Sequence, residues 1–326
     1  MSTVIVRPFR FGFTGGASSK RARLLESARA VEALGYSTFG LADHFVRPFA
    51  PLVAGQAVAD ATTSLRVTQT VLAQDFRQPA VLAKELATLD VLSEGRVEVG
   101  LGAGWLQKEY EDAGLRFEAA PVRIARLEET AIILKGLFGG GPFTFTGEHY
   151  QIAGLEGAPR PVQQPRPPIM IGGGAKLVLS VAARQADIVQ LMPSNPKGRS
   201  LLDETQFSAG AIEEKIGWIR DAAGSRFDGI ELSAQLLECA VTEQPERHLS
   251  DFAERIATVT ERMGGARVEF ALDDLRNSPI VAVGSLDEVC ETLVETRSKY
   301  GISYFSAPID ARPDVLAPVI ERLAGN

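Results

Sequence analysis

The stretch Leu65–Trp105 most constrains the fold of this chain, because it has the pattern strand, helix, strand and glycine-rich loop. Leu65–Leu72 is rich in β-branched residues, which favours a strand. Leucines follow Pro79 at helical spacing, and proline is tolerated in a first helical turn. Alternation with period two resumes at Val97 and leads directly into glycines. The stretch therefore predicts a parallel βαβ unit whose second strand ends where bare backbone can approach a ligand.

The same alternation of strand and helix patterns continues along the chain. Further strands are predicted at Phe9–Phe13, Ser37–Leu41, Pro168–Ile171, Asp187–Leu191, Glu231–Val241 and Ser303–Ser306. Further helices are predicted at Lys20–Leu34, Ile124–Phe138, Leu177–Gln185, within Asp203–Ala223, at His248–Met263, after a capping box at Ser285–Glu288, and at Asp314–Leu323. At 326 residues this pattern favours a single-domain α/β fold, a closed (β/α)8 TIM barrel, over the alternative of an open doubly wound sheet.

Three segments depart from the regular alternation. Gly139–Pro168 is rich in Gly and Pro and carries short alternating pieces, which predicts an insertion with a hairpin. Met192–Arg199 is predicted as a loop within a variable region of about 192–230. Arg267–Ile280 gives no clear pattern.

Composition and charge exclude several classes of function. The net charge is -7 and no block of Lys and Arg is present, which argues against nucleic acid or an anionic membrane as a partner. Met1–Phe13 has no apolar core of signal-peptide length, and no run approaches a membrane span, so we expect a cytoplasmic protein. Cys239 and Cys290 fit no metal or redox spacing and are predicted to be buried free thiols.

In both candidate folds, ligands bind beyond the carboxyl ends of the strands. Five segments occupy such positions: Asp43–Phe45, Leu72–Phe76, Gly102–Trp105, Gly172–Ala175 and Met192–Asn195. We therefore expect these segments to surround the functional site.

Two of these segments are glycine-rich. Gly100–Trp105 fails the dinucleotide-binding pattern because its sixth position is Trp105, which leaves a plain tight turn or a loop whose bare backbone faces a planar ring. Gly172–Ala175 lacks the Lys-Ser/Thr of a nucleotide-hydrolysing loop. Its position between a strand and a helix suits a phosphate, which backbone N–H groups and the helix dipole would bind, and the alternative is a flexible turn.

His44 is the one histidine of three that is predicted at a strand's carboxyl end. A side chain with a near-neutral pKa suits proton donation or relay, whereas the alternative is a structural histidine. Its neighbour Asp43 is a candidate to orient it, although adjacent residues on an extended chain face apart. The histidines lack the spacing of metal ligands, so we expect no metal site. The chain also has no GxSxG motif, which argues against covalent hydrolysis.

Taken together, these motifs resemble the bacterial luciferase-like family of flavin and deazaflavin oxidoreductases. The matching stretches are ALGYSTFGLADHF, TLDVLSEGRVEVGLGAGWLQKE, GEHYQIAG, PVQQPRPPIMIGGG and YGISYF, which span most of the chain. The resemblance implies a (β/α)8 barrel with an insertion, and FMN or coenzyme F-420 bound in the barrel mouth.

The resemblance also implies roles for particular residues. Asp43 and His44 would face the cofactor ring as the catalytic pair, and a non-prolyl cis peptide would fall near Thr70-Val71, as in deazaflavin-using members. The other implied cofactor-binding residues are Gly102, Gly104 and Trp105 beside the ring, and Gly172, Gly173, Gly174 and Ala175 at the phosphate. Sugar-phosphate dehydrogenases of the family have a glutamate where Trp105 falls, which argues against glucose 6-phosphate as substrate.

The resemblance implies an F-420-dependent oxidoreductase that transfers a hydride between reduced deazaflavin and an activated C=C, C=N or C=O bond of a small organic substrate. The alternative on the same scaffold is an FMNH2-dependent monooxygenase that uses dioxygen. Alternatives of other classes are a flavin-binding protein without turnover and a metal-dependent barrel hydrolase. Members of the family are often dimers, so we expect a homodimer.

Overall fold

The structure is a computed structural model that describes residues 7–194, 204–262 and 267–326. Eight parallel strands close into a barrel, because β3 pairs with β2 on one side and with β5 on the other. In chain order the barrel strands are β1 (Arg10–Gly15), β2 (Thr38–Leu41), β3 (Arg66–Gln69), β5 (Val97–Gly102), β8 (Ile169–Gly173), β9 (Ile188–Leu191), β10 (Glu231–Gln235) and β13 (Ile302–Ser306). The predicted (β/α)8 barrel is confirmed, and the open sheet is excluded.

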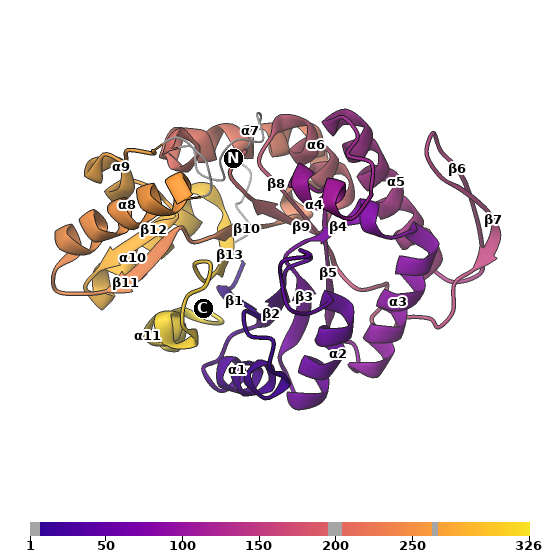
Figure 1. Cartoon of the computed structure of the whole chain (residues 1–326), viewed down its shortest axis with the longest axis horizontal. Helices are drawn as coiled ribbons and strands as arrows, with labels where there is room; N and C mark the ends of the chain where they lie inside the picture. The colour runs from indigo at the N-terminus through magenta and orange to yellow at the C-terminus, as the bar shows by residue number, and fades with distance from the viewer. Residues whose placement is uncertain (1–6, 195–203, 263–266) are drawn as a thin grey trace.

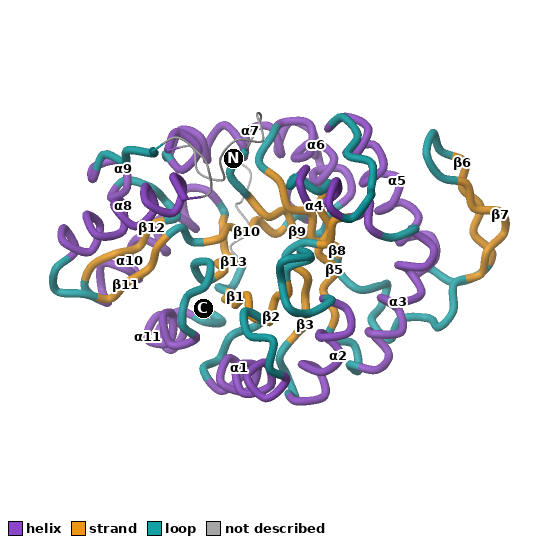
Figure 2. Tube along the Cα trace, viewed as in Figure 1, coloured by secondary structure: helices purple, strands orange, loops and turns teal. Residues whose placement is uncertain are grey.

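The helices surround the strands, as Figures 1 and 2 show. Eight of them follow barrel strands: α1 (Arg21–Ala33), α2 (Pro51–Ala61), α3 (Pro79–Leu92), α5 (Ala120–Phe138), α6 (Lys176–Gln185), α7 (Ala209–Ala223), α10 (Leu286–Tyr300) and α11 (Ala317–Leu323). Shorter 3-10 turns are η1 (Gln74–Phe76), η2 (Glu204–Phe207), η3 (Gly224–Gly229) and η4 (Pro313–Leu316).

The main core lies between the barrel strands and this helical layer. Phe11 and Val67 on the strands and Leu82 and Leu127 on the helices are fully buried in it. The apolar stripe of each amphipathic helix is covered by the strands, so burial of apolar area stabilises the closed barrel. The capping box predicted at Ser285–Glu288 is present at the start of α10.

Two excursions leave the barrel (Figure 1). The hairpin β6 (Pro142–Thr146) and β7 (Gln151–Glu156) is antiparallel and confirms the insertion predicted at Gly139–Pro168. The second excursion lies between β10 and α10. It consists of the parallel pair β11 (Glu238–Val241) and β12 (Val281–Gly284), with α8 (Pro245–Arg262) and α9 (Leu272–Arg276). Its helix α8 was predicted at His248–Met263, but its separate sheet was not.

The prediction of one strand over Glu231–Val241 is wrong, because the chain changes sheets within it. The N–H of Leu236 donates to Ser306 in the barrel, whereas the N–H of Leu237 donates to Ile280 beside β12. The strand predicted at Leu65–Leu72 is also divided, into β3 and the short β4 (Leu72–Ala73).

The helices α2 and α4 (Gln107–Asp112) were not predicted. In the predicted loop Met192–Arg199, residues 195–199 lie outside the described residues. Cys239 and Cys290 are buried free thiols, as predicted. In the described part of the chain, no helix is long and apolar enough to cross a membrane.

Candidate active site at the carboxyl ends of the barrel strands

His44 lies just beyond the carboxyl end of β2 and is held by a buried carboxylate. Its Nδ1 lies 2.7 Å from Oε2 of Glu109, a residue of the short helix α4 that is only 6% exposed. The His44 ring also lies edge-on to Trp105, with 5.8 Å between the ring centroids. The structure therefore brings together the ADHF and GAGW segments, which were predicted to share a site.

Asp43 has different partners from its neighbour. Arg77 donates to both carboxylate oxygens of Asp43, at 2.6 Å and 3.1 Å, and the backbone N–H of Ala73 donates to one of them at 3.1 Å. Asp43 thus ties the end of β2 to the segment around β4, and it does not orient His44. The hydrogen-bond partner of the His44 ring is Glu109 instead. The prediction that Asp43 faces a cofactor ring stays a prediction.

Thr70 and Val71 occupy space that three glycines leave free. The peptide bond between them is cis, as the resemblance implied. A Cβ on Gly40 would lie 2.6 Å from Cγ2 of Thr70, and a Cβ on Gly102 would lie 2.5 Å from Cγ2 of Val71. A Cβ on Gly172 would lie 3.3 Å from Cγ1 of Val71. The ends of β2, β3, β5 and β8 therefore meet here, and we call Gly40, Thr70, Val71, Gly102 and Gly172 the glycine floor.

The GGGA segment continues this surface toward the amino end of α6. A Cβ on Gly174 would lie 2.4 Å from the carbonyl oxygen of Met192, so the loops after β8 and β9 touch at this glycine. Ala175 is the N-cap of α6 and supplies no side-chain hydrogen bond to the first turn. The N–H groups of that turn are therefore left for another acceptor, which suits a phosphate.

Helix α4 is fixed against the GAGW loop by Tyr110. This side chain is 1% exposed, and its ring lies 5.0 Å from Phe76 and 5.0 Å from Phe117, between centroids. A Cβ on Gly104 would lie 1.9 Å from the Tyr110 hydroxyl, so only glycine fits at this point of the loop. Burial raises the pKa of Tyr110, which keeps the phenol neutral. Because the Tyr110 ring is packed between Phe76 and Phe117, the adjacent Glu109 is held in one place.

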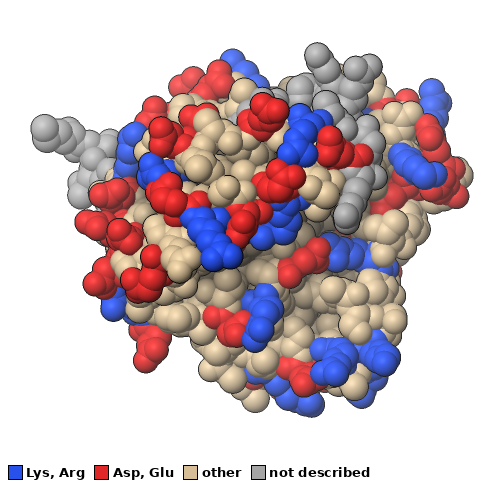
Figure 3. Space-filling model, turned by 60° about the vertical axis from the view of Figure 1, so that its left-hand side comes forward, with Lys and Arg blue, Asp and Glu red and all other residues tan. Residues whose placement is uncertain are grey.

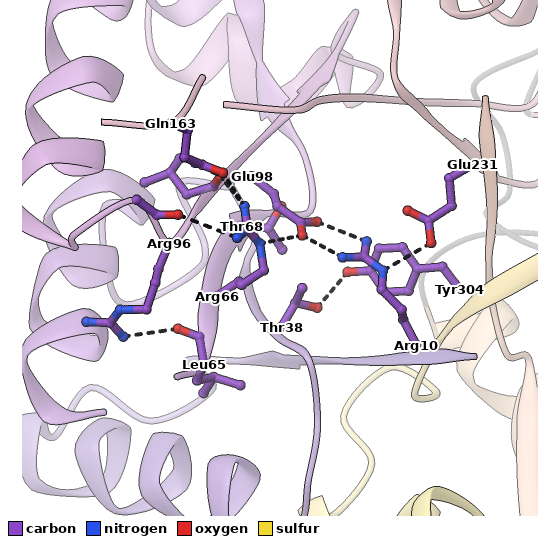
Figure 4. Close-up of polar contacts among 12 residues, drawn as sticks. Arg10, Thr38, Leu65, Arg66, Thr68, Arg96, Glu98, Gln163, Glu231 and Tyr304 are labelled. Carbon is purple, nitrogen blue, oxygen red and sulfur yellow. Dashed lines mark hydrogen bonds and ion pairs between the residues drawn. The ribbon is translucent and has the colours of Figure 1, made fainter. Parts of the chain in front are cut away.

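The opposite end of the barrel is filled by paired charges, shown in Figure 4. Arg10 and Arg66 each donate to the buried carboxylate of Glu98 at 2.7 Å, and Arg10 also donates to Glu231 at 3.0 Å. Burial alone would raise the pKa of Glu98, but Arg10 and Arg66 hold it below its usual value. The guanidinium of Arg10 lies 4.3 Å from the ring centroid of Tyr304. A cluster of paired charges thus lies at the amino ends of the strands, and the glycine floor lies at their carboxyl ends.

The residues at the mouth fit a flavin or deazaflavin. At the ends of four strands the glycine floor carries only two small side chains, those of Thr70 and Val71, which would suit the face of a planar ring. The uncapped α6 suits the phosphate of such a cofactor. In the described ranges, no group of three or more His, Cys, Asp or Glu is placed to hold a metal ion. On the face shown in Figure 3, acidic and basic side chains are interspersed.

Glu109 is the site residue that the sequence predictions missed. It lies within the LQKE end of the GAGW block, so the motif contained it, but α4 was not predicted. The predicted residues lie at or just beyond the carboxyl ends of β5 and β8, at the same rim: Gly102, Gly104, Trp105 and Gly172–Ala175. Their contacts with a cofactor stay predictions.

Comparison with known proteins agrees with this geometry. The family profile described as luciferase-like monooxygenase matches residues 1–303. The F420-dependent tetrahydromethanopterin reductase from Methanopyrus kandleri has a similar structure, with a TM-score of 0.76, 17% identity and coverage of 98% of this chain and 99% of that chain. An F420-dependent secondary alcohol dehydrogenase has a TM-score of 0.73, 17% identity and coverage of 97% and 99%. At such identities the likeness shows the shared fold.

Relatives in sequence include enzymes of both cofactor types. The FMNH(2)-dependent dimethylsulfone monooxygenase of Pseudomonas fluorescens (strain Pf0-1) is 32% identical over 49% of this chain and 43% of its own length. The F420-dependent glucose-6-phosphate dehydrogenase of Amycolatopsis mediterranei (strain U-32) is 29% identical over 61% of this chain and 66% of its own length. The chain thus spans less than half of the first relative and just under two thirds of the second. On the strength of the profile match and the barrel, the chain belongs to the luciferase-like monooxygenase family, whose members include flavin- and deazaflavin-dependent oxidoreductases.

Proposed function

We propose that this chain uses coenzyme F-420 to reduce an activated C=C, C=N or C=O bond of a small organic molecule. The observation that carries the proposal is His44, held at 2.7 Å by the buried Glu109 at the barrel mouth. Reduction of such a bond by hydride also consumes a proton, and an imidazole is well suited to deliver one near neutral pH. A histidine with a fixed ring beside the glycine floor meets that need.

The coenzyme would be held by main chain and small side chains at the ends of the barrel strands, with Trp105 beside them. The glycine floor would lie against the ring, Trp105 would flank it, and Gly173 to Ala175 with the first turn of α6 would bind the phosphate. When bound, the reduced deazaflavin would supply a hydride, because its ring has carbon in place of a flavin's nitrogen at position five and reacts poorly with dioxygen. His44 would hold the proton, and the protein would position both partners.

A second candidate is an FMNH2-dependent monooxygenase. The 32% identity to the dimethylsulfone monooxygenase favours it, and the same floor and helix end would suit FMN. The dehydrogenase of Amycolatopsis mediterranei acts on glucose 6-phosphate by name. Trp105 at the position where we expect a glutamate in such dehydrogenases leads us to propose a different substrate for this chain. A small-molecule substrate and a homodimer, which mass photometry would detect, are part of the same proposal.

The deciding experiment compares the two cofactors side by side. F-420 and FMN would be titrated into the purified chain while their absorbance and fluorescence are followed. Stopped-flow bleaching would then be measured for F-420H2 with a panel of enones, imines and ketones, and for FMNH2 with dioxygen. We expect F-420 to bind and F-420H2 to be oxidised by at least one class of acceptor. Oxygenation with FMNH2 together with inert F-420H2 would instead establish the second candidate.

A pair of histidine variants sharpens this test. His44→Gln should retain F-420 affinity within about twofold and lower kcat by about 100-fold, since general acid–base groups contribute about 10²–10⁴-fold. His149→Gln is the matched control, because His149 lies on the β6–β7 hairpin and outside the barrel mouth. Unchanged turnover by His44→Gln would refute the assigned role and favour a protein that binds flavin without turnover.

A further inference from the structure

We propose that Glu109 is a positioning residue that fixes the His44 ring with the proton on Nδ1, so that Nε2 is the atom that exchanges a proton with the substrate. The proposal rests on the proposed function of the same site. Glu109 does not touch the reacting atoms in this scheme, and it acts through the histidine.

The first support is the geometry of the contact. A carboxylate only accepts hydrogen bonds, so the ring atom 2.7 Å from Oε2 of Glu109 must carry the hydrogen. That atom is Nδ1, and in a neutral imidazole the other nitrogen then has a free lone pair. Within the described residues, the bond to Glu109 is the one hydrogen bond made by the His44 ring. Nε2 is thus left for a substrate.

The second support is the burial of the carboxylate. Glu109 is 6% exposed, and its second oxygen, Oε1, is buried with no hydrogen-bond partner among the described residues. A buried carboxylate is stabilised only by the partners it has, and His44 is the one that the structure gives it. If the ring turned over, Glu109 would lose that donor, so burial opposes the alternative orientation.

The third support is the anchoring of both partners. Tyr110, the next residue of α4, is held between Phe76 and Phe117, and the hydroxyl fits over the bare Gly104. Trp105 meets the His44 ring edge-on from the same loop. The distance between α4 and the end of β2 is therefore set by packed aromatic rings.

The other charges nearby are already engaged. Asp43 is bound by Arg77 on both oxygens, and Arg47 pairs with Asp310 at 3.3 Å. Neither carboxylate competes with Glu109 for the imidazole. This leaves the assignment of the orienting group unambiguous among the described residues at the end of β2.

The test reads the tautomer of His44 directly. In the unmodified chain labelled with ¹⁵N-histidine, long-range ¹H–¹⁵N spectra at a pH where the imidazole is neutral should show hydrogen on Nδ1, with His44→Gln identifying the signal. In Glu109→Gln the side chain can also donate, and the population with hydrogen on Nε2 should rise. A predominant Nε2–H form in the unmodified chain would overturn the proposal.

Kinetics supply the second readout. Glu109→Gln should lower kcat for F-420H2 oxidation by about 10- to 100-fold while KM and the Kd of F-420 stay within about twofold, as for other groups that orient a ligating or catalytic histidine. Glu111→Gln is the matched control, because Glu111 is an exposed carboxylate on the same helix and bonds to Gln107. Unchanged kcat in Glu109→Gln would contradict the positioning role.

The two readouts separate this proposal from the proposed function. If F-420 neither binds nor turns over, the proposed function fails, whereas the tautomer of His44 still tests the role of Glu109 as orienting group. If Glu109→Gln does not fold, the tautomer in the unmodified chain decides the question without any variant.

Discussion

Replacement of Gly102 by alanine should destabilise the chain by pressing on Val71. The added Cβ would lie 2.5 Å from Cγ2 of Val71, a separation that real Cβ atoms essentially never show. The other methyl group of Val71 faces Gly172, where the missing Cβ leaves some space, so a shift of Val71 would fall within the glycine floor. The strain should therefore remain local to the glycine floor.

The magnitude follows from two opposing effects. An overpacked site typically costs about 1–3 kcal/mol, and we take about 2 kcal/mol because the clash is with the end of a side chain. Alanine also restricts the unfolded chain, which returns about 0.5 kcal/mol, since Gly102 has no positive φ. The net expected loss is about 1.5 kcal/mol in the free energy of unfolding.

A double-mutant cycle isolates the contact. Val71→Ala alone should cost about 1 kcal/mol, because Val71 is only partly buried. It also removes the methyl group that Gly102→Ala would strike, so the double variant should lose only about 0.5 kcal/mol. Simple addition would give about 2.5 kcal/mol, and the expected coupling is therefore about 2 kcal/mol.

Urea unfolding followed by circular dichroism measures all four proteins. Gly217→Ala is the control, because Gly217 lies inside α7, where an added Cβ would have no described atom within 4 Å, and it should stabilise by up to about 1 kcal/mol. Additivity of the two substitutions within about 0.5 kcal/mol would refute the packing described here. F-420 titration of Gly102→Ala should in addition show weaker binding than Gly217→Ala.

Three further substitutions test stability elsewhere. Burial would raise the pKa of Glu32, but backbone N–H groups at Ser64 and its neighbours lower it from 4.5 to about 2. The resulting stabilisation is about 1–2 kcal/mol after discounting for exposure, and it is present above about pH 4.5 and lost as the pH falls toward about 2. In urea unfolding, Glu32→Gln should therefore be less stable than the parent at neutral pH and should approach the stability of the parent in acid. Glu98→Ala leaves Arg66 without its carboxylate partner and Arg10 with Glu231 alone, and it should cost about 3 kcal/mol in the same assay; a loss below about 0.5 kcal/mol would contradict this. Ser285→Ala should cost about 1 kcal/mol in thermal unfolding, with Ser285→Asp restoring the cap.

Local patterns were sufficient to predict the barrel. Most of the βα units carry their own strand alternation and helical stripe, and α10 begins with a capping box. Consecutive units of this kind usually pack side by side. Helix α2 escaped prediction because it is built from small residues. Its Gly55 lies so close to the barrel that a Cβ would be 2.9 Å from Cγ1 of Val67. This close approach of the helix backbone takes the place of a stripe of large apolar side chains.

The second excursion depends on partners distant in the sequence. Leu236 and Leu237 belong to one apolar run, and what separates them is the choice of Ser306 or Ile280 as hydrogen-bond acceptor. The hydrophobic pattern of this run does not indicate which acceptor each residue uses. The sequence therefore predicts that residues 231–241 are extended but not that they serve two sheets.

The same reasoning explains which parts of the site were predictable. His44 and the glycines were found because a strand end is a local signal with a known place in a barrel. Glu109 lies 65 residues from His44, and Arg77 lies 34 residues from Asp43. Pairings of this kind follow from closure of the barrel, which brings the loops of different strands into reach.

The excursion between β10 and α10 has a consequence for how such proteins diversify. The chain departs after Leu236 at the rim where β10 ends and is back in the helical layer by Ser285. The barrel strands pair with one another and not with β11 or β12, so a segment inserted there could vary in length while the strands keep their register. Such variation would reshape the rim around the site without a change in the strands that support it.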